Sequence, residues 1–250
     1  MTDRAGCHWL QMVTGLGVLI LIMQAVGLSH AFGPLWPVPT DIAMQFVRAS
    51  PRAVLLHNAR ISTLEMLQGL AIGLLAGSLL AFVARVLPAL SGSLNHFAVI
   101  VQAVPIVAIA PVLLTTVPRG LIPATLASIG SFFASFIAFS AGLSAVRPNY
   151  HDLFRVLGAG RIRYFWYLGL PTALPLLITG ISYAIPGAVA GAVIGEWFGA
   201  SQGLGIVLLQ TMRSGDTQIM LAAATLILAI TLAGYGLTFA LGRWTYGRVQ

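Results

Sequence analysis

Apolar residues gather into six long runs along the chain, and short polar segments separate them. A window of about 19 residues, the length of helix that spans a bilayer, selects all six runs. They predict an all-α membrane protein with about six transmembrane helices, and they leave no stretch long enough for a second domain. Residues 1–250 are therefore expected to form one transmembrane domain. The predicted spans are 11–28, 61–84, 94–115, 121–146, 168–195 and 217–242.

The first apolar run and the segment that follows it each carry a further sequence signal. The first run has a second interpretation as a signal peptide, because Ser29-His30-Ala31 resembles a small-residue cleavage site, although the apolar stretch is long for that role. After it, Pro34, Pro37 and Pro39 precede a stretch that could lie as an amphipathic helix on the membrane surface. Residues 29–60 are therefore predicted to lie outside the bilayer core.

Composition supports a membrane location. Hydrophobic residues make up 58% of the chain and charged residues 8%, with a mean hydropathy of +0.93, whereas soluble domains have about 25% charged residues. All thirteen basic residues are arginines, and they are spread among loops rather than clustered as in nucleic-acid binding. With both termini in the cytoplasm, the inner loops carry more arginines than the outer ones, as the positive-inside rule favours.

Glycine and proline patterns describe how the spans pack. Gly69, Gly73 and Gly77 repeat at every fourth position, and so do three glycines of the fifth span, 187, 191 and 195. Such stripes let helices approach closely, either within one subunit, which we favour, or at a dimer seam. Prolines in the third and fifth spans predict kinks and a role in lining a path, as in transporters and channels. These prolines are Pro105, Pro111, Pro171, Pro175 and Pro186.

A few polar side chains lie inside the predicted spans, where an ionisable group costs about 2.5–3.5 kcal/mol on insertion scales and usually faces the protein interior. Glu65 and Gln68 share a helix face as an acceptor-rich patch, or else Glu65 forms an ion pair with Arg60 or Arg119. The end of the fifth span is expected to mark the outer mouth, although interface anchoring alone would explain its tryptophan. The predicted path residues are Glu65, Gln68, Gln102, Pro105, Glu196 and Trp197.

The sequence argues against an enzyme. Residues 199–203 match the G-x-S-x-G pattern of hydrolases, but a nucleophile elbow needs a strand before it and a helix after it. The five histidines have no metal-ligand spacing, and Cys7 is the one cysteine, so no metal site and no cofactor are predicted. Without lysine the chain has no G-x-x-x-x-G-K phosphate loop. Any ATP-driven step must therefore come from a partner.

The loop at 147–168 carries the most specific motif. An acidic residue and two apolar residues are followed by three residues, Gly158, nine residues, Leu168, one residue and then Leu170-Pro171. This spacing predicts a short amphipathic helix, a turn and a second helix. The residues predicted to contact a soluble motor are Asp152, Leu153, Phe154, Arg155, Leu157, Gly158, Ala159, Leu170 and Pro171.

The same spacing resembles the EAA loop of ABC importer permeases. That loop reads Glu-Ala-Ala, three residues, Gly, nine residues, Ile, one residue, Leu-Pro; here the opening triplet is Asp152-Leu153-Phe154, with bulkier residues than alanine. Two further segments look like nitrate/sulfonate/taurine-type permeases, namely Gln102 to Pro105 with 111–114, and Gly195-Glu196 with 199–205. The resemblance covers roughly residues 60–242.

The resemblance implies a type I-like permease fold in a cell membrane (the inner or plasma membrane). It also implies a homodimer, two cytoplasmic ABC ATPase subunits, an extracytoplasmic solute-binding protein and alternating access, with surrounding membrane lipid and no nucleic acid. The solute would be a small organic molecule, either an anion such as a sulfonate or nitrate or a vitamin-precursor heterocycle. Glu65, where anion-importing relatives often look to have arginine, favours a neutral or cationic heterocycle.

Two other classes of protein stay open at this point. A self-contained secondary transporter or channel would need coupling-ion ligands or inverted repeats, and the sequence is expected to have neither paired membrane carboxylates nor a repeated half. A membrane scaffold without transport activity would need neither broken helices nor a spaced docking loop. An ATPase that associates with the chain would separate the importer from both.

Overall fold

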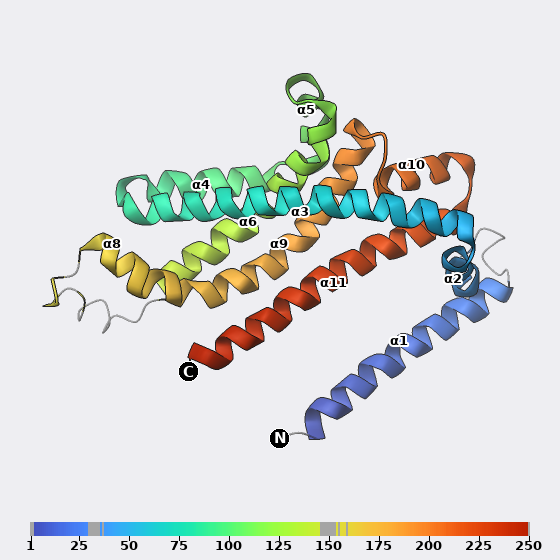
Figure 1. The fold of residues 1–250 in the computed structure, drawn as a ribbon, viewed down its shortest axis with the longest axis horizontal. Coiled ribbons are helices and arrows are strands. Elements are labelled where there is room, and N and C mark those ends of the chain that lie inside the picture. Colours follow the sequence, from blue (N-terminus) through green and yellow to red (C-terminus); the bar gives the residue numbers. More distant parts are fainter. Residues whose placement is uncertain are drawn as a thin grey trace.

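The fold is taken from a computed structural model that describes residues 3–29, 36, 38–145, 154, 156–158 and 160–249. Every regular element within these ranges is a helix. Three long helices form the centre of the molecule: α3 (Ala49–Val86), α6 (Ile122–Ser144) and α9 (Leu170–Gly199). Helix α6 packs against α3 and against α9 more extensively than any other helices pack together (Figure 1). The core of the chain is therefore a slab of three helices with α6 in the middle.

Glycine makes this slab thin. A Cβ on Gly73 would lie 2.5 Å from the backbone oxygen of Ser128 in α6, and a Cβ on Gly77 would lie 2.5 Å from that of Phe132. On the other side of α6, Gly187 of α9 meets the backbone of Gly130 with no side chain between them. Both glycine stripes therefore pack within one chain, as favoured from the sequence, and each does so against the same helix.

The third predicted span is broken. It consists of α4 (Pro88–Ala103) and α5 (Ile106–Thr116), whose axes differ by 96°. Val104 between them has an extended backbone (φ −76°, ψ 123°), and Pro105 offers no N–H to continue the helix. Figure 1 shows α4 running along α3 and α5 turning away from it. The prediction of a kink at Pro105 is confirmed, whereas α5 continues through Pro111.

The fifth predicted span differs from expectation. Helix α9 is one continuous helix through Pro175 and Pro186, so these prolines do not break it. It is preceded by α8 (Arg161–Tyr164) and a π-helical turn, η2 (Phe165–Gly169), which join it without a gap. A proline removes one backbone hydrogen bond, and small or hydroxyl-bearing neighbours in a packed bundle can accommodate that loss.

The remaining helices lie around the slab. Helix α11 (Thr217–Val249) packs beside α9, and the short α10 (Leu204–Ser214) packs on α9 and α11. Helix α2 (Pro39–Val47) joins α1 (Asp3–Ser29) to the rest. Three hydrogen bonds hold it there. The Thr40 backbone N–H donates to Gln24 Oε1 at 3.2 Å, Gln24 Nε2 donates to Thr40 Oγ1 at 3.1 Å, and Gln45 Nε2 donates to Gln218 Oε1 of α11 at 2.8 Å.

The boundaries of the spans are partly corrected. Among the described residues, four helices are long and apolar enough to cross a membrane, and a fifth crossing results if α4 and α5 count as one span. The first predicted span falls in α1, whose apolar part Gly17–Ser29 is shorter than those four. The amphipathic helix predicted before the second span is only α2, because α3 already begins at Ala49, twelve residues earlier than the predicted span. Leu55 and Asn58, on successive turns of α3 before the apolar run, are buried against the bundle.

Candidate functional site

Polar residues of α3 lie on one face of that helix and point toward α9 and α10. Asn58, Ser62 and Glu65 follow one another at intervals of four and three residues, so they form a line along the helix. Asn58 and Ser62 are buried. Buried polar groups are hydrogen-bonded in native proteins, so a line of them on a helix in a membrane protein indicates a defined partner.

The partner is the backbone where α9 passes into α10. The Gly203 N–H donates to Asn58 Oδ1 at 2.7 Å, and the Leu204 N–H donates to Ser62 Oγ at 2.8 Å. The Gly205 N–H donates to Glu196 Oε2 at 2.5 Å. The first backbone N–H groups of a helix have no partner within the helix. Side chains of α3 and α9 therefore cap the start of α10, and we call these three hydrogen bonds the α10 latch.

The latch requires glycine at residue 203. Its φ is 124° and its ψ 162°, a combination that is essentially confined to glycine. The carboxyl group of Glu196 occupies the space where a Cβ on Gly203 would lie. Within the glycine-rich segment that follows α9, residues 203–205 are therefore a buried turn built around Glu196, whereas Ser201 and Gln202 are exposed.

The Ser62 hydroxyl gives a first prediction. We expect Ser62→Ala to lower the free energy of unfolding by about 1–3 kcal/mol, because the Leu204 N–H loses its acceptor and stays buried. Thr63→Val is the matched control, since the neighbouring hydroxyl only donates to the Ala59 carbonyl of its own helix. Thermal melting in detergent measures both. Equal melting temperatures for the two variants would mean that the hydrogen bond between the Leu204 N–H and Ser62 contributes nothing to stability.

Two carboxyl groups meet at the latch. The side chains of Glu65 and Glu196 contact each other, and Ser62 lies beside the Glu196 carboxylate. Glu196 is 0% exposed. Glu65 Oε2 and Glu196 Oε1 are both buried and have no hydrogen-bond partner among the described residues. Each carboxyl group therefore has one unsatisfied acceptor within the protein.

A pocket of about 420 Å³ opens beside this pair. It lies between α3, the 3₁₀ turn η1 (Arg119–Leu121) and the end of α9. Glu65 and Arg119 give it one acidic and one basic group, and Gln202 adds an amide that lies 3.3 Å from His57 Nε2 through its Oε1. The pocket therefore offers both hydrogen-bond donors and acceptors. Its lining residues are Ile61, Glu65, Arg119, Gly120, Gly199, Ala200, Ser201 and Gln202.

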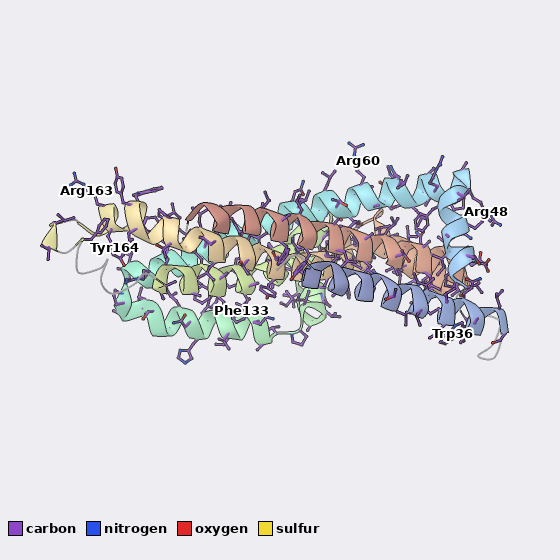
Figure 2. The ribbon with its side chains drawn as sticks, turned by 90° about the horizontal axis from the view of Figure 1, so that it is seen from below. Trp36, Arg48, Arg60, Phe133, Arg163 and Tyr164 are labelled. Atoms are coloured by element: carbon purple, nitrogen blue, oxygen red, sulfur yellow. The ribbon has the colours of Figure 1, made fainter. Side chains whose placement is uncertain are left out.

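The predicted path residues are only partly brought together. Glu65 and Glu196 meet, although Gln68 does not join them: it is exposed and lies outside the pocket lining. The two ion pairs considered for Glu65 are absent as well, because Arg60 points away from the bundle (Figure 2) and Arg119 lines the pocket without pairing with it. The expected acceptor-rich patch on α3 is therefore replaced by a carboxyl pair between α3 and α9.

Three further path residues lie elsewhere. Gln102 and Pro105 are exposed at the break between α4 and α5. Trp197 follows Glu196 on α9, but its side chain is 43% exposed while that of Glu196 is buried. Glu196 is buried because its carboxylate holds the α10 latch, and the assignment of the outer mouth to the end of the fifth span stays a prediction.

Sequence reasoning missed several residues of the site. Asn58 and Ser62 lie just outside or at the edge of the predicted second span, and their spacing with Glu65 was the available signal. Ser201 and Gln202 belong to the segment that matched the hydrolase pattern. In the structure this segment lies between two helices, α9 and α10, so no nucleophile elbow is formed.

The described residues of the motif at 147–168 precede the start of α9, whereas the pocket lies at the end of that helix. Figure 2 shows Arg163 and Tyr164 at one end of the long axis and Trp36 and Arg48 at the other. Asp152, Leu153, Arg155 and Ala159 lie outside the described residues. Gly158 has a φ of +65°, with open space around it, and so forms the predicted turn. Leu170 and Pro171 begin α9 as expected.

Side chains around this turn divide into two groups. The ring of Phe154 contacts that of Tyr164 edge to face, with centroids 6.1 Å apart. Val156 and Leu157, in contrast, are 86% and 69% exposed. The bulk of Phe154, which differs from the alanine of the EAA pattern, is thus packed within the chain. Val156 and Leu157 are the apolar side chains that the turn leaves uncovered.

A helical membrane domain with a broken span, a polar pocket and an exposed apolar turn has the features of a transport permease. The chain belongs to the family of binding-protein-dependent transport system inner membrane components, whose sequence pattern matches residues 69–246. The resemblance inferred from the loop and span motifs is thereby confirmed, and these comparisons give no support to a self-contained secondary transporter. The chain is a component of an inner membrane transport system.

Individual relatives agree with this family. The chain is 29% identical over 221 residues to a probable ABC transporter permease protein of Haemophilus influenzae, covering 88% of this chain and 90% of that protein. It is 27% identical to the formylaminopyrimidine transport permease protein ThiX of Halalkalibacterium halodurans, over 80% of each. It is 26% identical to the taurine transport system permease protein TauC of Escherichia coli, over 94% of this chain and 89% of that one.

A solved structure shares the fold. A chain of the MetNI methionine ABC transporter, in an inward-facing conformation, superposes with a TM-score of 0.69 at 16% identity. The match covers 79% of this chain and 99% of the other. The predicted importer permease fold is thereby confirmed.

Proposed function

We propose that the chain is the permease subunit of an ATP-driven importer and works as a homodimer with two cytoplasmic ATPase subunits. An extracytoplasmic solute-binding protein would deliver the solute. The observation that carries this proposal is the turn at Gly158, which exposes Val156 and Leu157 at one end of the molecule. Exposed apolar side chains on a soluble-facing loop are typical of a contact with another protein. The chain itself would perform no chemistry, and ATP would be hydrolysed by the partner.

The orientation follows from the same turn. An ATPase is cytoplasmic, so the Gly158 end lies in the cytoplasm and the pocket lies toward the other side. If the broken α4–α5 pair is one crossing and α1 another, both termini would lie in the cytoplasm, and the arginine bias supports this arrangement. In this arrangement α9 begins at the docking turn and ends at the pocket, which makes it a direct connection between motor and site.

Transport would proceed by alternating access. Closure of the ATPase dimer would move the docking turn, and α9 would carry that movement to the pocket. Of the predicted path residues, Glu65 and Glu196 lie at or behind the pocket wall, whereas Gln102 and Pro105 lie at the break in the third span. Irregular backbone at membrane depth is tolerated where it lines a cavity or is covered by protein. We assign that break to the dimer-facing side of the path, with Gln68 and Trp197 as further contacts of the second subunit.

The solute would be a small organic molecule. Relatives are named for formylaminopyrimidine, riboflavin, aliphatic sulfonates and taurine, so heterocycles and anions both occur among them. The pocket has one acidic and one basic side chain in addition to amide and hydroxyl groups. A neutral, polar heterocycle can use both kinds of group, whereas a sulfonate would face the Glu65 carboxylate at short range. We therefore propose a heterocycle rather than an anion.

The docking proposal is tested by co-purification. Tagged chain in detergent is expected to recover the ATPase, and the double variant Val156→Asp/Leu157→Asp is expected to recover at least about tenfold less, because charges replace the apolar contact. Both positions are exposed, so folding is preserved. Met212→Asp is the control, since Met212 is 63% exposed but lies on α10, away from the Gly158 end. Full ATPase recovery with the double variant would exclude this turn as the docking site.

A further inference from the structure

Glu65 of α3 and Glu196 of α9 are hydrogen-bonded to each other through their carboxyl groups. Glu65 Oε2 and Glu196 Oε1 are both buried, and neither receives a hydrogen bond from any other donor in the described part of the chain. An ionised carboxylate only accepts hydrogen bonds, whereas a protonated carboxyl group also donates one. A single proton shared between the two groups therefore supplies the donor that both oxygens lack.

Three further donors point at Glu196. The Gly205 N–H donates to its Oε2 at 2.5 Å, and the Ser62 hydroxyl and the Ile206 N–H donate to the same carboxyl group. Donors that point at a carboxylate stabilise its negative charge. The pair can therefore keep one negative charge inside the protein, whereas a second charge at contact distance would be strongly repelled. One proton and one negative charge are the state that fits this environment.

Within the described residues, no cation takes the place of this proton. Arg119 of η1 lines the pocket but forms no ion pair with either carboxyl group. Helix α6 has no charged side chain. His57 of α3 contacts Gln202 of the pocket wall rather than the carboxyl pair. The charged side chains at the far end of α10 are exposed, and they are Arg213 and Asp216.

The carboxyl pair and the α10 latch have Glu196 in common. Glu196 accepts the Gly205 N–H, and Ser62, which accepts the Leu204 N–H, donates to Glu196. Loss of the shared proton would put two negative charges in contact, and separation of the two carboxyl groups would pull Glu196 from its donors on α10. Glu65 is partly exposed on the pocket wall, so the proton can exchange with water there.

We propose that Glu65 and Glu196 share one proton and that this proton holds the α10 latch closed. Glu65 is then a positioning residue, which keeps Glu196 where it accepts hydrogen bonds from α10. Because the closed latch binds a proton that the open latch gives up, acid favours the closed form and alkali favours the open form. The inference concerns the conformation of the chain, so it does not depend on which solute is transported or on where the ATPase docks.

Infrared spectroscopy of the purified chain in detergent tests for the proton directly. A protonated carboxyl group has a carbonyl stretching band separate from the bands of carboxylates, and this band shifts in D₂O. We expect wild type to show the band at neutral pH and Glu65→Gln to lose it, because a permanent amide N–H replaces the shared proton. Asp41→Asn makes the same exchange on the exposed surface of α2 and should keep the band. A wild type without the band, or a Glu65→Gln variant that retains it, would overturn the inference.

Hydrogen exchange measures the link between the proton and the latch. Release of one proton raises the equilibrium constant for opening by up to about tenfold for each unit of pH. We expect this rise for the Leu204 and Gly205 N–H groups of wild type when their exchange rates are divided by those of Glu65→Gln at the same pH. The division removes the pH dependence of chemical exchange. The Ile219 N–H, which donates to Asp216 at the start of α11, is the control, and its ratio should stay constant.

A second variant keeps this test decisive. Glu196→Gln places an amide among donors that need an acceptor, so it should lose protection of the α10 amides at every pH, whereas Glu65→Gln should keep it. If Glu65→Gln does not fold, wild-type exchange at Leu204 and Gly205 divided by that at Ile219 should show the same rise with pH. A ratio that stays constant for α10, or equal protection in the two glutamine variants, would overturn the inference and leave the docking proposal intact.

Discussion

Replacing Gly187 by leucine is expected to prevent the slab of α3, α6 and α9 from forming. Gly187 meets the backbone of Gly130 directly, so a side chain there collides with main-chain atoms that cannot rotate away. Overpacking a close contact costs about 1–3 kcal/mol, and more where the backbone must move. We expect a loss of about 3 kcal/mol or more, which corresponds to a melting temperature lower by about 6–12 °C in a chain of this size. Size-exclusion chromatography of heated, detergent-solubilised protein measures this shift.

Gly236→Leu is the control for this experiment. Gly236 also lies in the middle of a long apolar helix, α11, but a Cβ there would meet no atom within 4 Å. The Gly236→Leu variant carries the same added side chain, and leucine is a better helix former than glycine. It should therefore melt at or above the wild-type temperature. If the two leucine variants had the same melting temperature, the backbone contact between α6 and α9 would not determine the stability of the core.

Gly203→Ala is expected to abolish the α10 latch and, with it, transport. The backbone conformation of Gly203 costs about 1–3 kcal/mol for any other residue. In addition, the new methyl group would occupy the position of the Glu196 carboxyl group, which would have to leave the Gly205 N–H. Because residues 199–202 line the pocket, its wall would be lost at the same time. Uptake of labelled solute into cells and the melting temperature should both fall.

Gly215→Ala isolates the backbone contribution. Gly215 ends α10 with a φ of 75°, and a Cβ there would meet nothing within 4 Å. Alanine in this left-handed conformation costs about 1–2 kcal/mol. Gly203→Ala should therefore be clearly the more damaging of the two in both assays. Similar losses would show that backbone strain alone, and not displacement of Glu196, is responsible.

Much of the fold could be predicted because it depends on composition and local pattern. Apolar runs located the long helices, and the spacing of Gly69, Gly73 and Gly77 identified a close helix contact. Pro105 was correctly associated with a break, since its missing N–H acts locally. The spacing around Gly158 predicted a turn that the positive φ of this glycine confirms. Each of these signals is contained within one helix or one loop.

The candidate site was harder to predict because it depends on contacts between distant segments. Asn58 and Ser62 can be recognised as part of the site only when Gly203 and Leu204 lie beside them. Those two residues are 145 and 142 positions further along the chain. The pairing of Glu65 with Glu196 likewise requires α3 and α9 to be placed side by side. Periodicity assigned Glu65 to a patch with Gln68, since both share a helix, and this was wrong. The continuity of α9 through two prolines was missed for the same reason: packing against α6 outweighs the local defect.

The thinness of the slab limits how the molecule can move. Where glycines of α3 and α9 touch the backbone of α6, the side chains at the contact are alanines and serines, which leave little room for a change of rotamer, so these three helices are expected to resist sliding past one another. A change of conformation must then carry them as one rigid body. The bending would be confined to connections outside the slab, and the joint at Val104 and Pro105, between α4 and α5, is one that already lacks a continuous helical backbone. A displacement applied at one end of α9 would therefore be transmitted in full to its other end.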